Sequence, residues 1–137
     1  MTEMRPLDER VMVAGQIGTA DLAQARRHGV TMIVNNRPDG EDPGQPTSAE
    51  IEAAADAAGL DYRHIPIARG MGPAQIEEMV SALSELGDGR MLAYCRSGMR
   101  SCLAWAVASR EMGVPREEVE QGATRAGYSL GAVDHLL

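Results

Sequence analysis

A cysteine followed by a glycine turn and an arginine is the group in this sequence best suited to covalent chemistry. Residues 93–101 read AYCRSGMRS and contain Cys95, one of two cysteines in the 137-residue chain. An apolar run precedes the cysteine, so we expect Cys95 at the carboxyl end of a strand, directly before a helix. Backbone N–H groups and the positive end of the helix dipole at such a junction favour a thiolate or a bound anion. We therefore predict that Cys95 is a nucleophile at neutral pH.

The residues that follow Cys95 fit this chemistry. Gly98 lets the chain turn without a Cβ clash, and the guanidinium of Arg100 can bind two oxygens of an anion. A hydroxyl of Ser97 or Ser101 can donate a hydrogen bond to the sulfur. We predict catalytic roles for Cys95 and Arg100 and a substrate-binding loop made of Arg96, Ser97, Gly98, Met99 and Ser101.

Both cysteines also have structural interpretations. Free cysteine is among the most buried residue types, so Cys95 could be a small core residue at the end of a strand. The two nearby arginines and the glycine turn favour the reactive interpretation, because a core cysteine needs neither. Cys102 lies in an apolar helical stretch, where we expect it in the core, and its alternative role is that of a resolving thiol.

Composition narrows the classes of partner. The net charge is -7 and no basic tract with interleaved aromatic residues is present, so we expect no nucleic acid partner. The sequence shows neither a signal peptide nor an apolar run long enough to cross a bilayer, which predicts a cytoplasmic protein with no membrane partner. Two cysteines are too few for a disulfide framework. The three histidines have no metal-ligand spacing, so we expect no metal or other cofactor.

Strand-like and helix-like segments alternate along the chain. Thr47 and Glu50 have the spacing of a capping box at a helix start. The pattern predicts one domain over residues 1–137, with an α/β fold and a central, mainly parallel sheet of four to five strands flanked by helices. We expect strands at 10–17, 30–35, 61–67 and 90–95, and helices at 20–28, 47–59, 73–87, 99–112, 114–127 and within 129–137.

Four arginines come at or just after the expected carboxyl ends of strands. Because the ends of parallel strands meet at one edge of a sheet, we expect these side chains to form one basic rim on an otherwise acidic protein. Such a rim would attract a small anion toward Cys95. The alternative is a set of separate, solvated side chains. The four residues are Arg37, Arg69, Arg96 and Arg100.

Several motifs resemble the phosphatase-like domain of the bacterial beta-lactamase hydrolase-like proteins, a family described both as phosphatase-like and as sulfur transferase. These motifs are AGQI, NNRPDGE, GQP, HIPI and YCRSGMRS, followed by Trp105, and the resemblance covers roughly residues 10–112. It implies the fold of a dual-specificity-type cysteine phosphatase. Phosphatases of that type have five residues between the cysteine and the arginine, whereas single-domain rhodaneses commonly have four, as here between Cys95 and Arg100.

The short spacing favours sulfur transfer in our sequence-based interpretation. A phosphoryl group presents three oxygens and needs a larger ring of donors than a single persulfide sulfur does. The acid that the phosphatases commonly place after the strand matching HIPI is also absent, since Ala68, Arg69 and Gly70 stand there. Asp39 could replace that acid. Its alternative role is that of a turn residue in Pro-Asp-Gly.

We therefore predict a rhodanese-like sulfurtransferase in which Cys95 takes a sulfane sulfur from a small anionic donor, such as thiosulfate or a glutathione persulfide. The first alternative is a cysteine phosphatase that acts on a phosphate ester through a phosphocysteine. The second is a module that binds an anion and turns over nothing. A persulfide dioxygenase or metallo-β-lactamase-like partner and the oligomeric state are left open by the residues.

Overall fold

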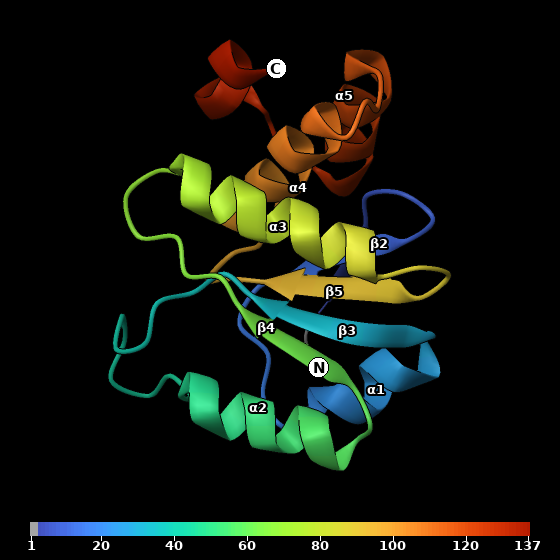
Figure 1. Ribbon diagram of the computed structural model, residues 1–137. Coiled ribbons are helices and arrows are strands. Elements are labelled where there is room, and N and C mark those ends of the chain that lie inside the picture. Colours follow the sequence, from blue (N-terminus) through green and yellow to red (C-terminus); the bar gives the residue numbers. More distant parts are fainter. Residues whose placement is uncertain (1–2) are drawn as a thin grey trace.

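A five-stranded sheet lies between two layers of helices in the computed structural model, which describes residues 3–137 (Figure 1). The strands run in the order β1 (Met4–Pro6), β2 (Val11–Ala14), β5 (Arg90–Tyr94), β3 (Val30–Asn35) and β4 (Asp61–His64). Only β1 is antiparallel to its neighbour among these strands. The predicted α/β fold with a mainly parallel sheet is confirmed.

Helices cover both faces of the sheet. One face carries α1 (Asp21–Arg27) and α2 (Ser48–Ala57), and the other carries the remaining helices (Figure 1). These are α3 (Pro73–Glu85), α4 (Met99–Glu111), α5 (Arg116–Ala126) and the C-terminal 3-10 helix η1 (Gly131–Leu136). Within residues 3–137, no helix combines the length and the apolar composition needed to span a bilayer.

The central strand β5 is buried on both faces, as its continuous apolar sequence predicts. Met91 and Ala93 pack into the core beneath α3 and α4, whereas Leu92 and Tyr94 pack into the core over α1 and α2. Because a shift of one residue would exchange these two sets, the two cores fix the register of the strand. This packing fixes the position of Cys95, which follows the last residue of β5.

Local signals in the sequence placed most element boundaries. Thr47 and Glu50 form the predicted capping box at the start of α2. Strand β4 lies at the sheet edge and begins at Asp61, but it ends at His64 and not at residue 67 as predicted, because Pro66 lacks the N–H that a ladder needs. Sequence analysis missed β1, because three residues that end in a proline carry no readable alternation.

Candidate active site

Cys95 is buried at the junction between β5 and α4. Its side chain is 1% exposed, and its backbone N–H donates to the carbonyl of Ala14 at 3.3 Å, which extends the pairing with β2 by one residue. The Sγ atom accepts a hydrogen bond from the N–H of Gly98 at 3.1 Å. Gly98 has φ +91°, in the left-handed region that favours glycine. The glycine turn thus directs a backbone amide at the sulfur, and a hydrogen bond of this kind stabilises the thiolate form.

Arg100 is held by a carboxylate from a distant loop. Its Nη1 and Nη2 atoms donate to Glu41 Oε2 and Oε1 at 2.9 and 2.8 Å, and Nη1 also donates to the carbonyl of Ile67 at 2.6 Å. The hydrogen bonds from Arg100 are the main reason that the pKa of Glu41 is lowered to about 2. Glu41 is likewise the main cause that raises the pKa of Arg100, and Cys95 contributes to the same shift. Glu41 therefore occupies the two-point site that we predicted for substrate oxygens.

Arg37 lies beneath this pair and is 3% exposed. Its guanidinium donates to Glu41 Oε1 at 2.8 Å, to Asp42 Oδ2 at 2.5 Å and to Gln16 Oε1 at 2.9 Å. A buried guanidinium needs such partners, because an unpaired charge in the interior is costly. Arg37 thus holds the two carboxylates in place, and its predicted role in substrate binding stays a prediction.

Three of the four arginines predicted on one rim do meet. Arg37 and Arg100 both bind Glu41, and the exposed Arg96 lies 3.7 Å from Asp42. Arg69 is exposed in the loop between β4 and α3, and makes no ion pair within residues 3–137. A role for Arg69 in substrate binding stays a prediction.

Sequence reasoning missed the two acids at the centre of this rim. Glu41 and Asp42 lie in the irregular loop over residues 36–46, between β3 and α2. The signal that could have found these acids was a long polar loop, together with arginines at the ends of neighbouring strands. Glu41 is 59 residues from Arg100 in the chain, so no local pattern links the two.

Asp39 has a local partner. Its Oδ1 atom accepts the N–H of Ser48, the first residue of α2, at 2.8 Å. A carboxylate is favoured at a helix start because it faces the positive end of the helix dipole. This contact favours the turn and capping role of Asp39, and its role as a general acid stays a prediction.

The predicted hydroxyl donor to the sulfur is not found at either serine of the loop. Ser101 donates to Asn36 Oδ1 at 2.8 Å, and Ser97 Oγ accepts the N–H of Met99 at 3.4 Å. Asn36 is fully buried and donates to the carbonyl of Ile65 at 3.0 Å, so its own oxygen needs a donor. Ser101 supplies that donor and ties α4 to the ends of β3 and β4.

Cys102 is a core residue, as predicted. It is fully buried on α4, and burial raises the pKa of its thiol to about 12. The thiol is therefore neutral at physiological pH, which fits a residue of the core.

An apolar cavity of about 380 Å³ lies beside Arg100. Its walls come from the loop after β4, from α4 and from η1. The apolar side chains that line it include Ile67, Met71, Leu103, Val133 and Leu136. Arg100 lines this cavity and also follows the loop around Cys95, so the cavity lies next to that loop.

The fold is that of a cysteine-phosphatase-like domain, with a buried thiol at the strand–helix junction and an arginine five positions later on the helix. Solved structures agree at the level of fold. Kinase associated phosphatase superposes with a TM-score of 0.71, covering 99% of this chain and 91% of that chain at 17% identity. At such low identity the similarity shows the architecture alone.

The chain belongs to the family described as beta-lactamase hydrolase-like protein, phosphatase-like domain, whose model matches residues 3–111. It is 33% identical to a beta-lactamase hydrolase-like protein of Agrobacterium fabrum over 96% of this chain but 31% of the relative. The chain therefore spans less than a third of the length of that curated relative. A solved structure of a phosphatase candidate from Neisseria meningitidis is 31% identical, with a TM-score of 0.80 and 96% coverage of both chains. The family resemblance inferred from the motifs is confirmed.

Proposed function

We propose that this domain is a cysteine phosphatase that hydrolyses a phosphate monoester through a phosphocysteine on Cys95. The observation that carries the proposal is the hydrogen bond from the Gly98 N–H to the buried sulfur, at a helix start next to Arg100. The relatives add weight, since the family and the Neisseria meningitidis structure are described in phosphatase terms. The sulfurtransferase that we preferred from the sequence has no support among these relatives.

The proposed reaction has two steps, in which the Cys95 thiolate and then a water molecule attack phosphorus. The Cys95 thiolate attacks phosphorus, an S–P bond forms, and the bond from phosphorus to the ester oxygen breaks. Water then attacks phosphorus, the S–P bond breaks, and the thiolate returns as inorganic phosphate leaves. The Gly98 N–H and the Arg100 guanidinium supply donors for the sulfur and the phosphoryl oxygens. Binding requires Arg100 to exchange the carboxylate of Glu41 for oxygens of the substrate.

The leaving oxygen of the ester must take up a proton from a nearby acid or from water. Asp39 is the acid that sequence reasoning selected, and its carboxylate is bonded to the N–H of Ser48. We assign the proton to solvent water, with Asp39 as the alternative donor after release of Ser48. An ester whose leaving group is a stable anion needs no such proton, so aryl phosphates are the substrates of choice for a test.

The substrate class follows from the cavity beside Arg100. An anion held by Arg100 over Cys95 would place its organic group next to the apolar walls formed by Leu103 and Val133. Burial of apolar surface stabilises a complex by about 25 cal/mol per Å². A phosphate ester with an apolar organic group therefore fits this site better than a polar one.

Sulfur transfer is a second candidate because of the spacing in the loop. Four residues separate Cys95 from Arg100, and a hydrogen bond to Sγ comes from the amide of Gly98. In that reaction the thiolate attacks the outer sulfur of thiosulfate, an S–S bond forms, and sulfite leaves with the electron pair of the broken bond. A thiol acceptor then removes the sulfur. A persulfide dioxygenase or metallo-β-lactamase-like partner would use such a product.

Two assays separate the candidates. Hydrolysis of an aryl phosphate by the wild-type chain, lost in Cys95→Ser, is the result that the phosphatase proposal expects. Addition of one sulfur to Cys95 by thiosulfate, seen by intact mass spectrometry without aryl phosphate hydrolysis, would overturn it in favour of sulfur transfer. Neither activity, with phosphate still protecting Cys95 from alkylation, would indicate a binding module.

A further inference from the structure

The peptide group between Ser97 and Gly98 is hydrogen-bonded at both ends. Its N–H, on Gly98, donates to Cys95 Sγ at 3.1 Å, and its carbonyl, on Ser97, accepts the hydroxyl of Tyr128 at 3.0 Å. The N–H and the C=O of a trans peptide lie in one plane and point in opposite directions. The contact with Tyr128 therefore determines where the N–H points.

We propose that Tyr128 is a positioning residue that holds this peptide group in the orientation whose N–H stabilises the Cys95 thiolate. The proposal rests on the proposed function of Cys95 as a nucleophile. Tyr128 follows α5 and lies outside residues 3–111, which the family model matches. It is thus a component of the site that the loop motif itself does not contain.

Glycine at position 98 makes such a restraint necessary. Glycine adopts positive and negative φ almost equally well, so its own backbone does not lock the preceding peptide group. If that group rotated by half a turn, the carbonyl oxygen of Ser97 would face the sulfur and repel a thiolate. The hydroxyl of Tyr128 opposes this rotation by holding the carbonyl on the other side. The two residues are also in direct contact, since a Cβ added at Gly98 would clash with that hydroxyl.

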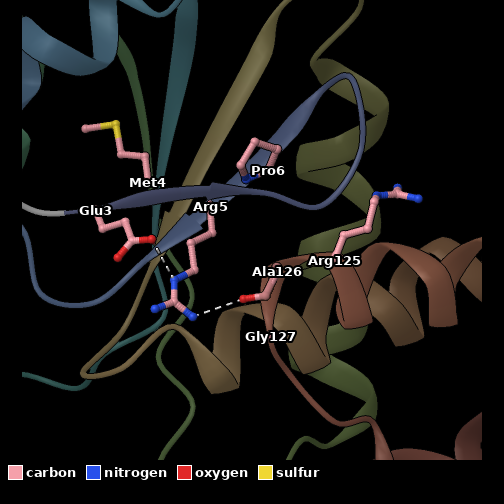
Figure 2. A pocket seen from close by; sticks show the side chains of 7 residues that line it. All are labelled: Glu3, Met4, Arg5, Pro6, Arg125, Ala126 and Gly127. Carbon is pink, nitrogen blue, oxygen red and sulfur yellow. Dashed lines mark hydrogen bonds and ion pairs between the residues drawn. The ribbon is translucent and has the colours of Figure 1, made fainter.

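Tyr128 is itself held by two separate parts of the chain. Its backbone N–H donates to the carbonyl of Ala123 at 2.9 Å, and the guanidinium of Arg5 lies 5.7 Å from the centre of its ring. Arg5 in turn donates to the carbonyl of Ala126 at 3.0 Å and lies 3.4 Å from Glu3, as Figure 2 shows. The short strand β1 and the end of α5 therefore both hold Tyr128 in place.

Tyr128 is suited to be a permanent donor. Burial raises the pKa of its hydroxyl above the usual range, so the group stays protonated wherever a thiolate is needed. Arg100, Cys102 and Tyr128 are charged or titratable groups that interact electrostatically with Cys95. Removing only the hydroxyl of Tyr128 leaves the ion pair between Arg100 and Glu41 and the buried Cys102 in place.

The test compares the pH profile of Cys95 alkylation in wild type and in Tyr128→Phe. Iodoacetamide reacts with the thiolate, and peptide mass spectrometry follows Cys95 separately from Cys102. We expect the midpoint of the profile to move up by about 0.3 to 1 pH unit in Tyr128→Phe, the size of one weakened hydrogen bond. Tyr62→Phe is the matched control, because the hydroxyl of Tyr62 contacts Ser48 and Asn35 and not the loop. An unchanged profile in Tyr128→Phe would overturn the proposal.

Two further measurements separate a positioning role from a structural one. With an aryl phosphate, the loss in kcat/KM for Tyr128→Phe should shrink as pH rises, because the thiolate then forms without help; a deficit that is constant with pH would contradict the proposal. Exchange of the Gly98 amide hydrogen, followed by NMR, should be slower in wild type than in Tyr128→Phe, and equal rates would also contradict it. A wild-type chain whose Cys95 alkylates like a free cysteine and that hydrolyses no phosphate would instead refute the proposed function.

Discussion

Arg100 and Glu41 form a two-point hydrogen bond next to the loop around Cys95, with N···O distances of 2.9 and 2.8 Å. The arginine that should bind a substrate anion is thus already occupied by a carboxylate of the same chain. Under the proposed function an anion competes with Glu41 for Arg100, and we expect this competition to weaken the binding of phosphate.

Replacement of Glu41 by glutamine removes the competing charge while keeping the size of the side chain. We expect inorganic phosphate to inhibit Glu41→Gln at a concentration about three to ten times lower than in wild type, the scale of a partly exposed ion pair. Inhibition of aryl phosphate hydrolysis measures this directly. If Glu41→Gln bound phosphate more weakly than wild type, Glu41 would instead be needed to hold Arg100 in its binding position.

Acid stability should report the same carboxylate. The pKa of Glu41 is lowered to about 2 from an ordinary value of 4.5, mainly by hydrogen bonds from Arg100. A lowered pKa in the folded state contributes stability above pH 4.5, and that contribution is lost as pH falls toward 2. Urea unfolding between these values should therefore show a flatter pH dependence for Glu41→Gln than for wild type. Parallel curves would show that Glu41 is not held as an ion in the folded chain.

Gly98→Ala tests the geometry of the turn. The left-handed conformation costs a non-glycine residue about 1 to 2 kcal/mol, and the added Cβ would also clash with the hydroxyl of Tyr128. We expect a loss of more than about tenfold in kcat/KM, since one weakened donor at a reacting group has an effect of that order. Gly113→Ala is the matched control, with φ +93° and no atom near the added Cβ. Gly113→Ala should lose only the stability that the left-handed conformation costs, measured by urea unfolding, and should keep its activity.

Filling the apolar cavity should change substrate preference. Ala132 is exposed and lines the cavity beside Arg100, so Ala132→Trp would occupy the space that we assign to the organic group. We expect KM for naphthyl phosphate to rise by about tenfold and KM for methyl phosphate to stay unchanged, because the lost burial of one ring is worth at least 1.4 kcal/mol. Ala74→Trp, on the exposed side of α3, controls for the added ring. An equal change for both esters would remove the cavity from the substrate site.

Local sequence signals predicted the features that depend on residues close together in the chain. The apolar run of β5, the turn at Gly98 and the helix after it placed Cys95 correctly at a strand–helix junction. The residues that complete the site were missed because they arrive from distant parts of the chain. Tyr128 meets Ser97 across 31 residues, and no spacing rule connects a tyrosine after a terminal helix with a loop carbonyl.

The preference for sulfur transfer came from two properties, the length of the loop and the absence of an acid after the strand that matches HIPI. Loop length limits how many amides can face an anion, but it does not count donors that come from elsewhere. Arg100 approaches the sulfur closely enough to interact with it, and the apolar cavity extends the site beyond the loop. The size of the loop alone therefore does not decide the size of the ligand.

Detection of the covalent intermediate tests the central claim most directly. The wild-type chain is mixed with an aryl phosphate, stopped in acid within milliseconds and examined by intact mass spectrometry. We predict a species heavier by one phosphoryl group, located on Cys95 by peptide mapping and absent from Cys95→Ser. Hydrolysis of the ester at the wild-type rate by Cys95→Ser, or a phosphoryl group on any other residue, would contradict the account.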